Sequence, residues 1–234
     1  MTLVGTATNV KKSALFEASF EGIQLKQAKS LKFLGVHIDQ ELSMETQTAK
    51  VVQRSFSQLV TLRKLRNSLP QRVMKHLIQA LVFPHVTYCL PAWAPPVQTL
   101  RRRMDKVINF AVRIVSKRRR SDHISDARKE LGWLTFEETI YSRDCSLVHK
   151  MVHRTNAPHN IKTLACYRED ISERPTRASA DGMLHIQRCK LEVTRKTVPV
   201  RAVRAWNEIA VDLRRNANVH TFKKQLALSL ISQQ

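Results

Sequence analysis

Hydrophobic residues recur every three or four positions through the middle of the chain, and this spacing predicts helices. A first helix is expected from Ser43, a candidate N-cap, to about Arg66. Pro70 suits the first turn of a second helix, and Pro84 must end or kink it because proline lacks an N–H donor. The residues expected to face inward are Met44, Val52, Phe56, Leu59, Leu62 and Leu65 in the first helix, and Val73, Leu77, Ala80 and Leu81 in the second.

The third helix, at about 97–117, has the clearest separation of apolar and polar positions. Arg102, Lys106, Arg113 and Lys117 follow one another at i, i+4, i+11 and i+15, so they form a single stripe. This stripe lies on a different side from the apolar residues. The expected buried side consists of Leu100, Met104, Val107, Ile108, Ala111, Ile114 and Val115.

The N-terminal segment reads mainly as strands. Two short apolar runs within 14–25 are separated by Glu21-Gly22, which is typical of a hairpin turn. The segment 31–38 alternates well enough to predict one buried strand that ends at Asp39. Asp39 is a lone carboxylate, for which a turn or capping role is expected.

The C-terminal half predicts further helices and one weak strand signal. Thr135 and Glu138 form a capping box that opens a helix to about His153. Residues 156–182 are polar and loop-rich, whereas 183–200 has the alternation of a strand or hairpin. The apolar residues of the predicted helices are Phe136, Ile140, Leu147 and Met151 in the first, Val203, Trp206, Ile209, Ala210 and Leu213 in the second, and Phe222, Leu226 and Leu230 in a third that Thr221 caps.

These elements predict a mainly α protein, a helical bundle with a small N-terminal β element and room for a short C-terminal hairpin. Its regions would be a β element at 1–40, a basic helical region at 41–120 and a helical C-terminal region at 121–234. Hydrophobic residues make up 43% of the chain, enough for a core that would include Trp93, Trp133 and Trp206. No apolar run approaches the ~18–20 residues of a membrane helix, so no membrane partner is expected.

The four cysteines are widely spaced and form no C-x-x-C pair. This spacing favours reduced thiols in an intracellular protein of the nucleus or cytoplasm. Cys145, His149 and His153 fall at i, i+4 and i+8 of one helix, opposite its predicted core face. Because a zinc site there would need a fourth ligand, an exposed stripe is the expectation.

Positive charge dominates the composition and is unevenly distributed. The chain has 40 Lys and Arg against 19 Asp and Glu, and residues 63–120 contain 14 of these bases with a single acid, Asp105. Such a concentration attracts a polyanion, although a solvated helix face would show the same excess. An anionic membrane surface fits less well, because no Trp- or Phe-rich face accompanies the charge. Nucleic acid is the expected partner, with candidate binding residues Arg63, Lys64, Arg66, Arg102, Lys106, Arg113, Lys117, Arg118, Arg119 and Arg120.

Catalytic motifs are missing from the sequence. A two-metal phosphoryl-transfer site needs converging carboxylates, yet no Asp-Asp pair occurs, and adjacent acids occur only at 137–138 and 169–170. No glycine-rich phosphate loop, dinucleotide fingerprint or G-x-S-x-G motif is present. The residues predict no catalytic group, no cofactor and no metal site in this chain.

Several short segments, taken in order, match the pattern of a known family: FLGVHID at 33–39 with Leu42-Ser43, Leu69-Pro70 with ALVFP at 80–84, the stretch 88–93, LGWL at 131–134, RAWN at 204–207 and TFKK at 221–224. Together they resemble the C-terminal part of the reverse transcriptases of non-LTR (LINE-like, jockey-type) retrotransposons. In two places the sequence departs from the family pattern, where Thr139 or Ile140 replaces an arginine and Glu208-Ile209 replaces Leu-Pro.

In that family the Tyr-x-Asp-Asp turn, the fingers and most of the palm precede these segments. The resemblance therefore implies the palm end, thumb and tail of an RNA-directed DNA polymerase, with the Mg²⁺-binding carboxylates outside this chain, which would be inactive alone. It also implies that a helical thumb grips the backbone of the template–primer, an RNA–DNA hybrid or duplex. Two alternatives stay open: a basic helical structural or interaction protein, and a non-functional retroelement relic.

Overall fold

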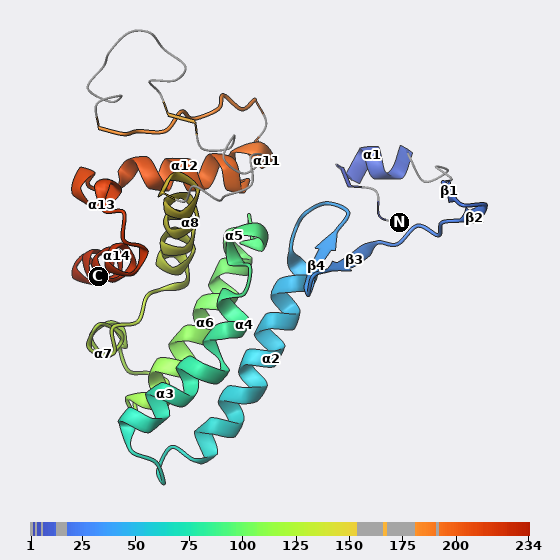
Figure 1. The fold of residues 1–234 in the computed structure, drawn as a ribbon. Helices are drawn as coiled ribbons and strands as arrows, with labels where there is room; N and C mark the ends of the chain where they lie inside the picture. Colours follow the sequence, from blue (N-terminus) through green and yellow to red (C-terminus); the bar gives the residue numbers. More distant parts are fainter. Residues whose placement is uncertain are drawn as a thin grey trace. The chain divides into compact units, whose positions relative to one another are not determined.

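The computed structural model is mainly helical, with two small antiparallel sheets near the N-terminus (Figure 1), so the predicted fold class is confirmed. The chain divides into two compact units, which are described separately. Unit 1 comprises Met1–Cys89 and Trp93–Arg118, and unit 2 comprises Leu90–Ala92 and Arg119–Gln234. The residues that the structure describes are 2, 4–5, 7–12, 18–153, 166–167, 181–190 and 192–234.

The N-terminal part of unit 1 contains two hairpins and a short helix. The two residues of each hairpin turn have the positive φ angles of a type I′ turn, 50° and 80° at Glu21-Gly22 and 45° and 85° at Leu34-Gly35. The first hairpin was predicted, but the single buried strand at 31–38 is wrong, because Leu34-Gly35 folds it into a hairpin. The all-strand interpretation also missed a helix. The elements are α1 (Ala7–Lys12), β1 (Ser19–Phe20), β2 (Ile23–Gln24), β3 (Ser30–Phe33) and β4 (Val36–Asp39).

Helix α2 (Glu45–Lys64) begins where the carboxylate of Asp39 binds the backbone. Asp39 Oδ1 accepts the Ser43 N–H at 2.8 Å, and Asp39 Oδ2 accepts the Met44 N–H at 2.8 Å. The N-cap is Met44, with a left-handed φ of 59°, and not Ser43. The predicted cap was thus one residue early, whereas the expected turn or capping role of Asp39 agrees with its bonds to the turn that precedes α2.

The rest of unit 1 is a bundle in which α2 packs against α3, α4 and α6. The buried side of α3 is formed by Met74 and Ile78, while Val73 and Leu81 are 41% and 47% exposed, so its predicted inward face was wrong by one residue. The predicted end of this helix before Pro84 is confirmed. All seven predicted inward residues of α6 are buried. The bounds are α3 (Gln71–Leu81), α4 (Phe83–Thr87) and α6 (Gln98–Val115); between α4 and α6 lies α5 (Leu90–Trp93), whose first three residues belong to unit 2.

Unit 2 is built around α8, which packs against α12 and α14. The predicted capping box is present, since Thr135 N–H donates to Glu138 Oε2 at 2.8 Å and Glu138 N–H donates to Thr135 Oγ1 at 3.2 Å. The last helix is capped by Asn218 and not by Thr221. Asn218 Oδ1 accepts the His220 N–H and the Thr221 N–H, which have no acceptor within the helix. The bounds are α7 (Ser125–Glu130), α8 (Phe136–His153), α11 (Glu192–Arg195), α12 (Val198–Glu208), α13 (Val211–Arg215) and α14 (Val219–Ser232).

The predicted strand or hairpin at 183–200 is wrong. Leu184 forms only an isolated antiparallel bridge with Tyr167, and the segment continues into α11 and α12. The side chain of Asn207 holds this segment in place. Its Nδ2 donates to Leu184 O at 2.9 Å, and its Oδ1 accepts the Leu184 N–H at 2.9 Å. Most of the predicted loop at 156–182 lies outside the described residues.

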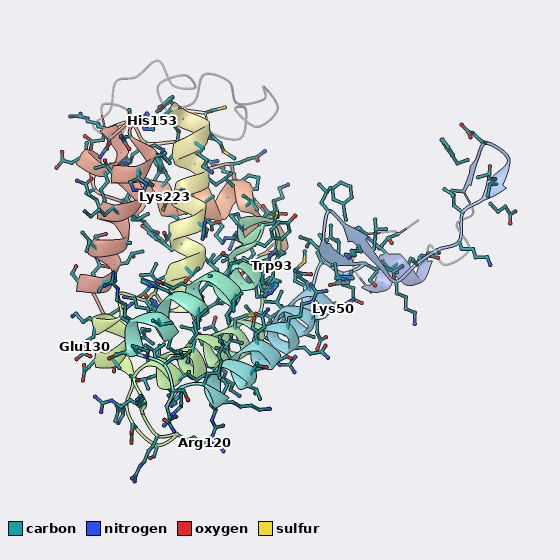
Figure 2. The ribbon with its side chains drawn as sticks, turned by 60° about the horizontal axis from the view of Figure 1, so that its bottom comes forward. Lys50, Trp93, Arg120, Glu130, His153 and Lys223 are labelled. Carbon is teal, nitrogen blue, oxygen red and sulfur yellow. The ribbon has the colours of Figure 1, made fainter. Side chains whose placement is uncertain are left out.

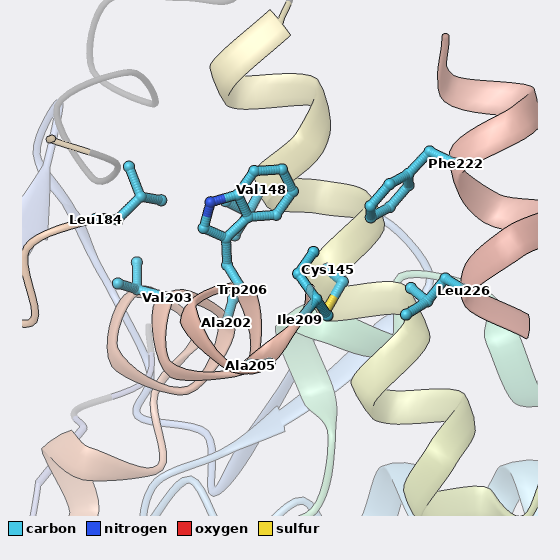
Figure 3. Close-up of a cluster of buried hydrophobic side chains, with 10 residues drawn as sticks. All are labelled: Cys145, Val148, Leu184, Ala202, Val203, Ala205, Trp206, Ile209, Phe222 and Leu226. Atoms are coloured by element: carbon cyan, nitrogen blue, oxygen red, sulfur yellow. The ribbon is translucent and has the colours of Figure 1, made fainter. Parts of the chain in front are cut away.

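The core of unit 2 contains side chains that the sequence pattern placed at the surface. Cys145 is fully buried among Trp206, Phe222 and their neighbours (Figure 3). His149 is 2% exposed, and its Nε2 is 2.7 Å from Asn216 O, while His153 Nε2 is 2.9 Å from Arg214 O. The predicted exposed stripe is therefore wrong, because α8 is covered on more than one side. The predicted burial of the three tryptophans is confirmed.

Candidate nucleic-acid interface

Helix α6 presents basic side chains on the side that its own core contacts leave uncovered. Its buried residues cover one continuous arc of the helix. At about 100° per residue, Lys106 and Arg113 lie about 40° and 20° from Arg102, opposite the centre of that arc. Arg102 and Lys106 are exposed, whereas Arg113 is half-buried. The predicted stripe thus exists on α6 over these three residues.

Lys117 does not continue this stripe. Helix α6 ends at Val115, and Lys117 has a left-handed φ of 55°, so its direction no longer follows from the helical repeat. Arg118 is the last residue of unit 1, while Arg119 and Arg120 belong to unit 2. The Arg119 N–H donates to Asp122 Oδ2 at 2.7 Å and closes a turn. The structure therefore divides the predicted basic run between the two units.

The C-terminal ends of α2 and α6 lie at the same end of the unit 1 bundle. Glu45 in the first turn of α2 approaches Arg103 near the start of α6 at 3.8 Å, and the Phe56 and Phe110 rings further along are 5.6 Å apart. The two helices therefore run in the same direction, side by side (Figure 1). The predicted residues at the end of α2 and those that follow α6 therefore lie toward the same end of the bundle: Arg63, Lys64 and Arg66, and Lys117 and Arg118.

The helical part of unit 1, from α2 to α6, contains little negative charge to offset these cations. No acid occurs between Glu45 and Asp105 in the sequence. Arg103 of α6 pairs with Glu45 at 3.8 Å, and both side chains are more than half exposed. Exposed pairs of this kind contribute little to stability. The bundle surface therefore carries a largely uncompensated positive charge.

Sequence reasoning missed a second group of cations, near the start of α2. Lys50 and Arg54 are exposed one turn apart on α2, and Lys32 lies on β3. The i, i+4 spacing of Lys50 and Arg54 was a visible signal. Their proximity to β3 and β4 was not visible, because it depends on how the hairpin packs on α2.

Two titratable groups of unit 2, the Cys145 thiol and the Asp144 carboxylate, are buried and have structural surroundings. Burial raises the pKa of the Cys145 thiol well above its ordinary value, with Asp144 and Glu208 adding to the effect, so this cysteine is not an activated nucleophile. Within the described residues, no group of three or more His, Cys, Asp or Glu could hold a metal ion. Asp144 instead forms a bidentate pair with Arg201, at 2.6 and 3.0 Å.

Comparison with known proteins gives no relative: no family model, no curated protein and no solved structure matches the chain. Over the part of the chain that the structure covers, no helix is both long and apolar enough to span a bilayer. The fold and the charged surface together define the class only as a mainly helical protein with a strongly basic bundle.

Proposed function

We propose that this protein binds nucleic acid through the sugar–phosphate backbone, with little dependence on base sequence. The observation that carries the proposal is the basic helical surface of unit 1, where Arg102 and Lys106 point away from the core and no acid occurs between Glu45 and Asp105. Lys and Arg contacts to phosphates supply affinity and register without reading bases.

We further propose that the chain corresponds to the palm end, thumb and tail of a non-LTR retroelement reverse transcriptase. The resemblance of 33–39 and the later segments supports this assignment, and a thumb that grips an RNA–DNA hybrid agrees with a basic helical bundle. The Mg²⁺ that such an enzyme uses does not fit the acids described here. Asp39 already accepts hydrogen bonds from Ser43 and Met44, and among the described residues it belongs to no group of three or more His, Cys, Asp or Glu that could hold a metal ion. Polymerisation by this chain alone is therefore not part of the proposal.

Salt dependence of hybrid binding tests the proposal. Fluorescence anisotropy would measure affinity for RNA–DNA hybrids of unrelated sequences at several salt concentrations. If about five phosphates are contacted, log K should fall with log salt with a slope near −4, equally for each sequence. The variant with Arg102, Lys106, Arg113 and Lys117 all changed to Gln should flatten the slope.

A charge-matched control separates location from net charge. Changing the exposed bases Lys129, Arg188, Lys190 and Arg204 of unit 2 to Gln removes the same charge and should leave the slope nearly unchanged. Equal effects of the two variants would contradict a binding surface on α6. Primer extension by the purified chain on a homopolymer template would contradict the non-catalytic assignment.

A structural or interaction protein is the second candidate, and exposed apolar side chains favour it. Phe20, Ile23, Phe33 and Leu34 are 59–75% exposed on the two hairpins of unit 1. Exposed apolar groups of this kind mark surfaces that contact other proteins. If the protein melts cooperatively but does not bind nucleic acid at low salt, that result would favour this candidate or a relic without function.

A further inference from the structure

A small pocket in unit 1 is lined by basic side chains from three segments that are distant in sequence. Its volume is about 90 Å³. Lys32 and His37 come from β3 and β4, Lys50 and Arg54 from α2, and His85 from α4. Lys50 lies close to the start of α2 (Figure 2). No acidic residue lines the pocket, so several positive groups meet around one cavity.

Backbone contacts fix the walls of this basic pocket. The His37 N–H donates to Gln47 Oε1 at 3.0 Å, which holds β4 against α2. The Tyr88 hydroxyl donates to Leu34 O at 2.9 Å, which holds the hairpin turn from the other side. Gly35 has a φ of +85°, and an added Cβ would meet the Tyr88 ring at 3.5 Å, so glycine suits the turn at this contact. The lining residues are therefore positioned by the fold.

The charges in the pocket repel one another. Lys50 Nζ is 3.0 Å from His37 Nε2. This arrangement requires a neutral imidazole, whose Nε2 accepts a hydrogen bond from the Lys50 ammonium group. Desolvation lowers the pKa of His37, and Lys50, Lys32 and Arg54 lower it further. The nearest acid along β4, Asp39, is already hydrogen-bonded at the start of α2. A bound anion would relieve this repulsion and favour the protonated imidazole.

The size and charge of the pocket select one class of anion. A water molecule occupies about 30 Å³, so a 90 Å³ pocket holds a tetrahedral oxyanion but not a nucleoside. Lys32, Lys50 and Arg54 carry permanent charges that match a dianion better than the monoanion of an internal phosphodiester. A second, more open cavity of about 510 Å³ shares Arg54 and His85 and is otherwise lined by Gln53, Ser57 and Gln58, with room for the rest of a ligand.

We propose that this pocket binds a phosphomonoester, either the terminal phosphate of a nucleic-acid strand or the phosphate of a free nucleotide. The inference deepens the proposed nucleic-acid binding by assigning strand-end recognition to unit 1. It is separable from that function, because phosphate binding can be measured without a polynucleotide.

Inorganic phosphate is the first probe. Proton NMR would follow the His37 ring resonances through a pH titration in phosphate and in chloride at equal ionic strength. Phosphate should raise the midpoint pH of the His37 titration, and this increase should saturate with phosphate concentration. The response should disappear in Lys50→Gln and in Arg54→Gln. Arg72→Gln, an exposed change in the first turn of α3 outside the pocket lining, is the matched control and should retain the response. If the His37 titration of the unmodified protein is the same in phosphate and in chloride, the proposal is overturned, and no variant is needed to reach that conclusion.

Strand ends then distinguish the two sources of the phosphate. A hybrid with terminal phosphates should bind about tenfold more tightly than the same hybrid with hydroxyl ends, for one charge-assisted contact, and Arg54→Gln should abolish the difference. A nucleoside monophosphate that competes as strongly as the phosphorylated hybrid identifies a free nucleotide as the source. Salt-sensitive binding of hydroxyl-ended hybrid without any phosphate response would overturn this inference and leave the proposed function standing.

Discussion

The buried ion pair between Asp144 and Arg201 offers a quantitative test of how unit 2 is held together. The Asp144 carboxylate is 1% exposed and accepts from Arg201 Nε at 2.6 Å and from Nη2 at 3.0 Å. Arg201 also donates to Lys196 O at 3.0 Å and to Pro91 O at 2.9 Å. Asp144→Asn would leave the guanidinium buried without its counter-charge, which typically costs about 3–5 kcal/mol. Because both carbonyl acceptors remain, we expect a loss near the lower value, about 3 kcal/mol.

Urea denaturation followed by circular dichroism would measure this loss as a shift of the unfolding midpoint at constant m-value. The control is Glu192→Gln, which removes a partner of Arg195 and Lys196 in pairs whose side chains are 41–65% exposed. That change should cost less than about 1 kcal/mol. A cost for Asp144→Asn no larger than that of the control would refute the assigned role of the pair.

Three further changes test other parts of the fold. Gly35→Ala should destabilise unit 1 by about 1 kcal/mol, because φ is +85° and Tyr88 lies against the new Cβ; a urea midpoint at the wild-type value would contradict this. Phe222→Ala should cost about 3–5 kcal/mol in chemical denaturation, since the ring is fully buried, and a change below 1 kcal/mol would place Phe222 outside the core. Burial raises the pKa of Cys145 and Tyr141, so the folded state keeps protons that the unfolded state releases. Stability should therefore be full below pH 9 and fall as the pH rises beyond the ordinary values of 9.0 and 10.0, and Cys145→Ser should weaken that fall in melts between pH 8 and 11.

The sequence predicted α6 well because its apolar residues occupy one arc and its polar residues the rest. It predicted the wrong face of α3 because two apolar rows lie side by side there. Val73 and Leu77 continue one row, while Met74 and Ile78 continue the other. Both rows satisfy the helical repeat, so only contact with α2 and α6 decides which of them is buried.

Burial of polar groups was hidden from the sequence for a different reason. His149 can be buried in the core of unit 2 because its ring nitrogen Nε2 forms a hydrogen bond with Asn216 O, 67 residues later in the sequence. A buried polar side chain needs such a partner, and a local pattern cannot show a partner so distant. The same holds for the basic pocket, since Lys32, Lys50 and His85 share no motif. The α6 stripe was visible because all of its members lie on one helix.

The scarcity of acids in unit 1 affects its folding and its binding through the same electrostatic repulsion. The segment from α2 to α6 folds by burying residues such as Leu59, Ile78 and Met104, while its surface cations repel one another. A ligand that binds only the folded state adds RT ln(1 + [L]/Kd) to the free energy of unfolding, where [L] is the free ligand concentration. A polyanion should thus stabilise unit 1, where the net charge is larger, more than unit 2, where 13 acids balance part of the 21 bases. Thermal melts with and without a polyanion would measure this difference, and equal stabilisation of the two units would contradict the proposed binding surface on unit 1.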